Sequence, residues 1–169
     1  MSIPYVAQAA DHEQLQWLGD GVMRIMLDGT KTGGQLTMLR SAAASGSASP
    51  VHVHASEDEI IVLLRGAGIF WAGDRRWELS EGGVAFLPRN IPHAYRFISE
   101  TVDMLAVCTP AGAEDFFRAA GWDLSRPKPA GWEITPASMA AAATATGQRI
   151  LGPPLTADQT IPAAYLSGQ

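Results

Sequence analysis

From Trp17 to about Pro110, the chain alternates short apolar runs with breaks that contain glycine. The runs have the length of β-strands and lie at residues 22–27, 35–40, 60–64, 69–72 and 84–87. Gly73 and Asp74 follow one of these runs and predict a hairpin turn into residues 75–79. Short strands with glycine turns at this spacing predict an all-β fold, either an antiparallel sandwich or a barrel.

The run Ile60–Leu64 is apolar at every position, which indicates that both faces of this strand are covered. Alternate residues of a strand point to opposite faces, so one face can line the interior beside Glu59. The other face needs a second sheet, the C-terminal tail or a partner subunit. We therefore expect a homodimer or a barrel that is capped by its own tail.

Beyond Pro110 the pattern changes to one that predicts helices. Residues 114–120 begin with acidic side chains, carry a basic one late and are followed by glycine, as in a short helix. Thr135 and Pro136 supply an N-cap and a first-turn proline for a second helix over residues 137–146. Its alanines allow close packing, so this helix is expected to lie on the barrel or on a neighbouring chain.

The 169 residues are expected to form a single domain. The net charge of −5 lacks the basic footprint that nucleic acid or an anionic membrane requires, so we expect neither partner. Cys108 is the only cysteine, which excludes an internal disulfide. No run approaches the ~20 apolar residues of a membrane span. The N-terminus has no signal-peptide pattern, and a cytoplasmic location is expected.

Three of the four histidines lie in two places, at His52-Val53-His54 and at His93. Because residues two apart on a strand point to the same face, His52 and His54 project side by side. Glu59 lies an odd number of residues beyond His54, but the polar residues 55–58 predict a turn, after which Glu59 can face the same cavity. His93 precedes an alternating pattern and is expected to lie on a strand. The four side chains together predict one metal site.

Three imidazoles and one carboxylate suit a divalent transition metal better than calcium or magnesium, which prefer oxygen ligands. Nickel, iron, manganese, cobalt and zinc all accept this set, so the sequence does not name the metal. Such an ion keeps positions for water, dioxygen or a chelating substrate and can act as a Lewis acid or a redox centre. His12 lies in a polar segment and is interpreted as a surface histidine.

The residues around the histidine pair resemble the first sequence motif of the cupin superfamily. Every marker of that motif is present, from Gly46 through the histidine pair and Glu59 to Gly66. The resemblance implies a double-stranded β-helix, the jelly-roll cupin barrel, followed by a short α-helical tail. The barrel core is expected at about residues 17–110 and the tail at about 111–169.

The second cupin motif is present with two departures. Gly82, Pro88 and His93 match it, whereas Asn90 replaces the usual glycine and Phe97 the usual asparagine. Asparagine tolerates a positive φ better than most residues, so the turn at Asn90 can still form. Phe97 is not a metal ligand in the motif, so the metal site is not put in doubt.

Within the superfamily, the chain resembles single-domain bacterial cupins related to quercetin 2,3-dioxygenase. The likeness rests on Gly33-Gly34, the metal motif, the segment 109–117 and the tail segment 147–155. It implies a flavonol or similar phenolic or enolic substrate that is chelated through its 3-hydroxyl, deprotonated by the glutamate ligand and cleaved by dioxygen with release of carbon monoxide. The residues that match the family's metal ligands are His52, His54, Glu59 and His93.

Glu59 and Tyr95 are the expected catalytic residues. A carboxylate ligand can accept a proton from a bound hydroxyl group as general base, or it can serve as a ligand only; the sequence leaves both readings open. Strand alternation places Tyr95 and Phe97 on the same face as His93, where the Tyr95 hydroxyl can touch a substrate. An aromatic lining suits a flat apolar substrate. Further candidates for the cavity wall are Phe70 or Trp71, and Phe86.

Two other functions fit the same residues. One is a non-redox isomerase, cyclase or lyase that acts on an enolisable metabolite, with Glu59 as the base. The other is a non-catalytic module whose metal holds a small molecule. Consumption of a flavonol under oxygen, but not without it, separates the dioxygenase from both.

Overall fold

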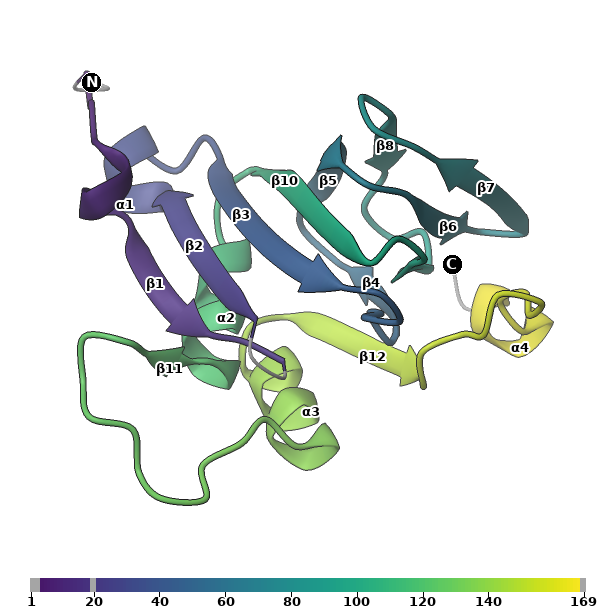
Figure 1. Cartoon of the computed structure of the whole chain (residues 1–169). Coiled ribbons are helices and arrows are strands. Elements are labelled where there is room, and N and C mark those ends of the chain that lie inside the picture. The colour runs from purple at the N-terminus through teal and green to yellow at the C-terminus, as the bar shows by residue number, and fades with distance from the viewer. Residues whose placement is uncertain (1–3, 19–20, 168–169) are drawn as a thin grey trace.

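In the computed structural model, residues 4–18 and 21–167 are described, and they form two antiparallel sheets (Figure 1). The larger sheet contains, in spatial order, β11 (Trp122–Asp123), β1 (Glu13–Gln16), β2 (Val22–Leu27), β3 (Thr37–Ala44), β10 (Thr101–Thr109), β5 (Asp58–Arg65) and β8 (Val84–Leu87). The smaller contains β12 (Gln148–Gly152), β4 (Val51–His54), β9 (His93–Phe97), β6 (Gly68–Ala72) and β7 (Arg75–Leu79). The all-β jelly-roll prediction is confirmed.

Five short helical segments accompany the sheets in the described residues. They are η1 (Ala9–Asp11), α1 (Gly29–Thr32), α2 (Ala113–Ala120), α3 (Pro136–Ala145) and α4 (Ala163–Leu166). The predicted helices at 114–120 and 137–146 correspond to α2 and α3, and the Thr135 side chain accepts a hydrogen bond from the Ser138 backbone at 3.0 Å, as predicted for an N-cap. No helix among the described residues is long and apolar enough to cross a membrane.

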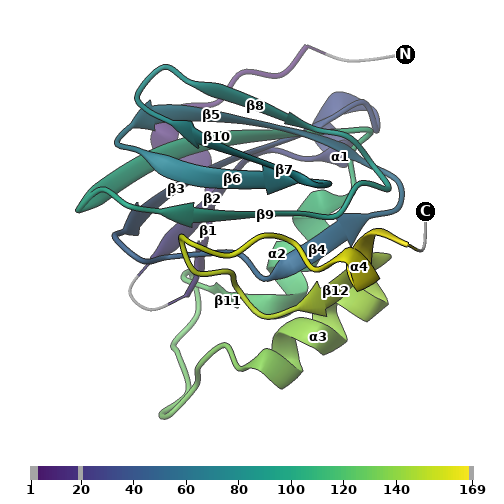
Figure 2. The ribbon, with the colours of Figure 1, turned by 90° about the vertical axis from the view of Figure 1, so that its right-hand side faces the viewer.

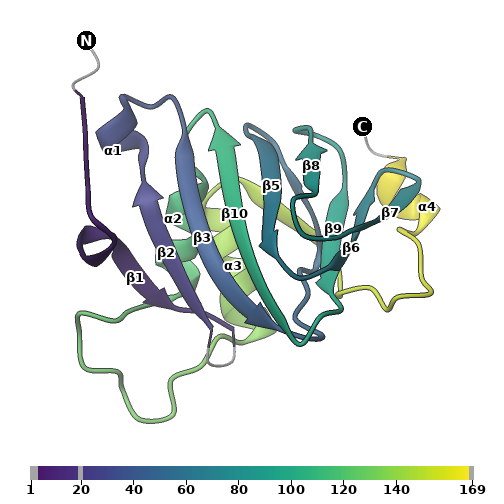
Figure 3. The ribbon, with the colours of Figure 1, turned by 45° about the horizontal axis from the view of Figure 1, so that its top comes forward.

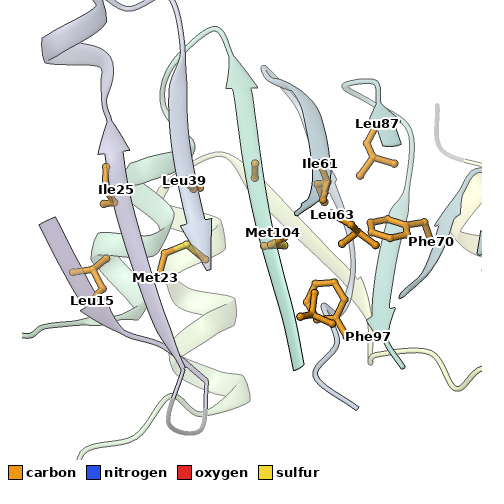
Figure 4. Close-up of a cluster of buried hydrophobic side chains, with 12 residues drawn as sticks. Leu15, Met23, Ile25, Leu39, Ile61, Leu63, Phe70, Leu87, Phe97 and Met104 are labelled. Carbon is orange, nitrogen blue, oxygen red and sulfur yellow. The ribbon is translucent and has the colours of Figure 1, made fainter. Parts of the chain in front are cut away.

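Inward-facing side chains of both sheets form the main hydrophobic core (Figure 4). Ile61 and Leu63 of β5 have no exposed surface and belong to one cluster with Phe70 of β6 and Phe97 of β9. Burying a side chain of this size contributes about 1.5–3 kcal/mol. The core therefore fixes the two sheets against each other, and with them the strands that carry the polar cluster described below.

The two faces of β5 differ in their burial. Ile61 and Leu63 point into the core, whereas Ile60 and Val62 are half-buried on the outer face and Leu64 is 42% exposed there. The C-terminal tail does not cover this face. It packs on the outside of the smaller sheet, where Leu155 and Ile161 join the buried Trp71 and Val51, and the yellow segment in Figure 2 runs alongside that sheet.

The segment after Pro110 contributes strands as well as helices, which the sequence pattern did not predict. β11 pairs with β1 at one edge of the larger sheet, and β12 pairs with β4 at one edge of the smaller sheet. The helices α2 and α3 pack together through Phe116, Ala120, Met139, Ala142 and Ala143. In Figures 1 and 3 these two helices lie against the part of the larger sheet formed by β1 to β3.

Two predicted turns are present with the expected geometry. Ala72 pairs with Arg75, so Gly73 and Asp74 form the two-residue connection of a hairpin. Asn90 has a φ of 64°, a left-handed conformation that asparagine tolerates and that most residues avoid. The strand β3 is longer than the predicted run 35–40 and extends to Ala44.

Candidate metal centre

Strands from both sheets bring the four predicted metal ligands together. β4 carries His52 and His54, β9 begins with His93, and β5 brings Glu59 from the larger sheet. His52 is paired with His93 across the two strands, so their side chains lie on the same face. After a short bend β5 begins at Asp58, and the next residue, Glu59, points inward. The cluster thus lies between the sheets, with imidazoles on one side and the carboxylate on the other.

The four side chains are close enough to share one ion. Each offers one ligand atom, and these atoms lie within 4.8 Å of one another. The ring centroids of His52 and His93 are 4.3 Å apart, and His93 Nε2 lies 3.5 Å from Glu59 Oε2. Two ligands that are each about 2.0–2.3 Å from a metal lie at most about 4.6 Å apart. Only small side-chain shifts would therefore enclose an ion.

Backbone carbonyl groups set the tautomers of two of the imidazoles. His52 Nδ1 lies 2.9 Å from the carbonyl oxygen of Pro50, and His93 Nδ1 lies 2.8 Å from that of Ile91. A carbonyl oxygen can only accept, so Nδ1 carries the hydrogen in both rings, and in the neutral ring Nε2 then keeps a free lone pair. Metal-binding histidines are oriented in this way by an acceptor on the other ring nitrogen.

The third imidazole has a different partner. His54 Nδ1 lies 3.7 Å from Glu57 Oε2, and both side chains are buried. A carboxylate behind a ligating histidine holds its ring and raises its basicity. His54 thus has a buried carboxylate beside its Nδ1, at a distance too long for a hydrogen bond, where the other two rings have a backbone carbonyl group.

Unsatisfied polar atoms gather in this cluster. Among the described residues, three buried side-chain atoms lack a hydrogen-bond partner: His54 Nδ1, Glu59 Oε2 and His93 Nε2. A buried polar group without a partner costs about 1–3 kcal/mol. A cation between the sheets would satisfy Glu59 Oε2 and His93 Nε2 together, whereas His54 Nδ1 lies on the side of Glu57; the residues present fit a transition-metal ion.

The protonation states also suit a cation. Burial would raise the pKa of Glu59, but His93 and the other two imidazoles lower this pKa to about 2, so the carboxyl group is ionised at neutral pH. Burial lowers the pKa of His52 well below its usual value, and His93 and His54 lower it further. Burial also lowers the pKa of His54, but Glu57 and Glu59 outweigh it and raise this pKa overall. His52 is thus neutral at neutral pH, and His54 is more readily protonated than His52.

A small chamber of about 60 Å³ lies beside the cluster. Its walls include Tyr95, Met104 and Cys108 from the barrel, and Phe116 and Met139 close it from α2 and α3. Burial and the charge of Glu59 raise the pKa of Tyr95, so its hydroxyl remains a neutral hydrogen-bond donor. The chamber is mostly apolar, and α2 and α3 contribute part of its wall.

A larger open hollow of about 450 Å³ adjoins the chamber. The two share Trp17, Leu18, Ala48, Tyr95 and Met104 in their walls. Small-molecule sites are typically about 300–1,000 Å³ in volume. The hollow falls in that range and the chamber does not, so the body of a flat substrate fits only in the hollow.

The aromatic residues expected in the cavity wall are only partly confirmed. Tyr95 lines the chamber, and Phe97 is stacked on it with ring centroids 4.9 Å apart. Phe70 faces inward but packs in the core. Trp71 points outward, where its indole nitrogen donates to the Gln159 carbonyl oxygen at 2.9 Å. Phe86 is 61% exposed on the outside of β8, so neither Trp71 nor Phe86 belongs to the wall.

Three residues near the cluster were not identified from the sequence. Cys108 is paired with Glu59 across β10 and β5 and lines the chamber, as the alternation within residues 101–109 could have indicated. Glu57 had been assigned to a turn. Gln148 also lines the chamber, but its segment had been assigned to a helical tail, and only its pairing with β4 brings it here.

Comparison with known proteins supports this description. Residues 40–110 match the profile of the cupin domain family, which spans both histidine motifs. Quercetin 2,3-dioxygenases from Bacillus subtilis (strain 168) and Aspergillus japonicus are each 26% identical to the chain, over 119 and 125 residues. Each match covers 70% of this chain but only 35% and 36% of the relative. The chain thus spans about a third of the length of these relatives.

A solved structure shows the same fold at lower sequence similarity. KdgF from Halomonas sp. matches with a TM-score of 0.56 and 15% identity, over 63% of this chain and 95% of that one. At this identity the likeness concerns the barrel alone. Together, the matched profile, the two facing sheets and the histidine–glutamate cluster identify residues 40–110 as a cupin domain, in a chain that resembles the quercetin 2,3-dioxygenases.

Proposed function

We propose that this cupin is a metal-dependent dioxygenase of the quercetinase kind, which cleaves a flavonol or a similar phenolic or enolic small molecule. The observation that carries the proposal is the convergence of three imidazoles and one ionised carboxylate beside a mostly apolar chamber. The similarity to two quercetin 2,3-dioxygenases over 70% of the chain supports it. The reaction uses dioxygen as co-substrate.

The residues that would hold the ion are His52, His54, Glu59 and His93. A bound nickel, iron, manganese, cobalt or zinc ion would supply Lewis acidity and, for the redox-active metals, electron transfer between substrate and dioxygen. The chain's own contribution is to present neutral imidazole lone pairs, two of them set by Pro50 and Ile91. The carboxylate reduces the charge of the site to +1 for a divalent ion.

Glu59 and Tyr95 have complementary roles in this proposal. Glu59 is ionised at neutral pH and is the carboxylate of the cluster, so it accepts the proton of the substrate's hydroxyl group. Tyr95 keeps its proton, because burial raises its pKa, and donates a hydrogen bond to a substrate oxygen. The deprotonated substrate is then held as an electron-rich oxyanion in an apolar chamber.

The substrate body is assigned to the hollow beside Trp17 and Tyr95. The chamber of about 60 Å³ is large enough for dioxygen or the chelating end of a substrate, while the rings lie in the hollow of about 450 Å³. Trp17 and Leu18 contribute to both walls and lie where the two cavities adjoin.

An oxygen-electrode assay with quercetin tests the proposed reaction. Metal-loaded protein is expected to consume dioxygen and quercetin in equal amounts and to release carbon monoxide, with no change of quercetin under argon. Conversion of an enolisable substrate under argon would assign a non-redox reaction instead. Saturable binding of quercetin without any product would show a binding module and contradict the dioxygenase.

We also propose that the chain forms a homodimer through the outer face of the larger sheet. Ile60 is paired with Phe86 and Val62 with Val84, and these side chains form one apolar surface with Leu64. Val84 and Phe86 are 58% and 61% exposed, and the tail packs on the other sheet. The sequence predicted that a second sheet, the tail or a partner subunit covers this face of the Ile60–Leu64 strand. Since the tail and the smaller sheet lie elsewhere, we assign the face to a second copy of the chain.

The variant Phe86→Asp is expected to convert the dimer to a monomer, because a charge would be buried without a partner in the interface. Sedimentation velocity measures the change, and metal content should stay at the wild-type level. Ile98→Asp is a matched control, since Ile98 is 45% exposed outside this surface. A monomeric wild type, or equal dissociation of both variants, would contradict the proposed interface.

A further inference from the structure

β12 adds a polar side chain to the metal chamber from outside the cupin motifs. The strand pairs antiparallel with β4, with Gln148 opposite His54 and Ile150 opposite His52 (Figure 2). Residues directly opposite each other in an antiparallel pair lie on the same face of the sheet. Since His52 and His54 face the chamber, Gln148 and Ile150 face it too, and both belong to its wall.

Gln148 is a buried residue whose carboxamide has no partner among the described residues, and its amide atoms are not sealed from the space beside the cluster. The residue is 6% exposed, and its side chain makes no hydrogen bond within residues 4–18 and 21–167. Other buried polar side chains in the barrel, such as Glu114 and Asp28, are hydrogen-bonded. An amide without a partner is unfavourable in an apolar wall, and an apolar side chain such as that of Ile150 would not carry this penalty. The unpaired amide beside the cluster therefore points to a ligand.

Gln148 and Tyr95 lie on opposite sides of the imidazoles. The order of strands is β12-β4-β9, so β4, with His52 and His54, runs between them. Along the strands, Gln148 is paired with His54 and so lies at one end of the histidine pair. Tyr95 lies at the other end, two residues beyond His93, which is paired with His52. A ligand over the cluster can thus meet the Tyr95 hydroxyl at one end and the Gln148 amide at the other. The amide offers two donors and one acceptor.

We propose that Gln148 is a specificity-determining residue that hydrogen-bonds an oxygen of a chelating, oxygen-rich ligand held at the cluster. The ligand class is a small molecule with two adjacent oxygens for the ion and an oxygen within reach of β12. That this ligand is the substrate rests on the proposed function. The hydrogen bond from Gln148 is expected in the bound complex whether or not the ligand is converted.

The variant Gln148→Leu tests the hydrogen bond. Binding of quercetin and of catechol to metal-loaded protein is measured under argon by the change in their absorbance, with Arg149→Ala as the control. Arg149 lies on the same strand, is exposed and is opposite Val53 rather than a ligand. Gln148→Leu is expected to weaken binding of at least one probe about tenfold, the effect of one hydrogen bond. Arg149→Ala should bind like the wild type.

Stability and metal content separate recognition from a structural role. If Gln148 serves the ligand, Gln148→Leu keeps its metal and unfolds at the wild-type temperature or above it, because an unpaired amide is replaced by an apolar group. In turnover, KM for quercetin should rise with little change in kcat. Wild-type affinity of Gln148→Leu for both probes, or failure of the wild type to bind either probe, would overturn the proposal. Binding that depends on Gln148 without any oxygen uptake would overturn the dioxygenase alone.

Discussion

Replacing Glu59 with glutamine is expected to lower turnover of quercetin by about 10²–10⁴-fold, even when metal is saturating. Glutamine keeps the size and one oxygen donor of the side chain but removes its charge and its basicity. The pKa of about 2 makes Glu59 a permanent carboxylate at neutral pH. It is the one carboxylate of the four-residue cluster, beside the imidazole of His93, and the variant removes it. Oxygen uptake at several metal concentrations, with metal content measured in parallel, gives the result.

The variant His54→Ala is the control for a loss of metal. It should act through metal occupancy, so that activity per bound ion falls far less than in Glu59→Gln. The deficit of Glu59→Gln should also shrink as pH rises, because the substrate's hydroxyl group then ionises without a base. Full recovery of Glu59→Gln at saturating metal and neutral pH would falsify the assignment of Glu59 as base and leave it a ligand only.

The polar cluster was predictable from the sequence because each step depends on local geometry. His52 and His54 share a face through the two-residue period of a strand, and the bend before Asp58 resets the alternation so that Glu59 points inward. His93 required the second motif, since nothing local places it beside His52. The turn at Asn90 was predictable from the φ that asparagine tolerates, and it has that φ.

The wall residues could not be assigned in the same way, since alternation loses its meaning where both faces of a strand are apolar. Phe70 and Trp71 are adjacent and both fully buried, one in the core and the other under the tail. On β8 the burial shows that Leu87 faces inward and Phe86 outward, but the run Val84–Leu87 is apolar throughout. The identity of the inward face is decided by which strand pairs with which, and that is a long-range property.

The tail illustrates the same limit. β12 forms only when residues 148–152 meet β4, which lies about a hundred residues earlier in the chain. The helix caps at Thr135 and Gly121 are local and were predicted, whereas the strand pairings on either side of α3 are not local. As a result Gln148, the one polar residue that the tail adds to the chamber, could be found only from the structure.

Metal binding is expected to stabilise the fold, and His93→Ala is expected to abolish that stabilisation. His93 Nε2 and Glu59 Oε2 are buried without hydrogen-bond partners, so an ion bound only by the native state relieves both. Free metal at 100 times its Kd adds about 2.7 kcal/mol to the free energy of unfolding. The unfolding temperature of chelator-treated protein should therefore rise as metal is added back to the wild type, and not in His93→Ala.

The variant His12→Ala is the matched control, because His12 lies at the end of η1 and outside the cluster. It should keep both its metal and the metal-dependent rise in unfolding temperature. Lowering the pH should weaken metal binding, since the pKa of His54 is raised by Glu57 and Glu59 and protons then compete with the ion for this ring. Above that pKa the ring is neutral, and protonation of His54 should no longer lower the affinity. Equal loss of metal from His12→Ala and His93→Ala, or a wild-type unfolding temperature indifferent to added metal, would contradict a metal site formed by this cluster.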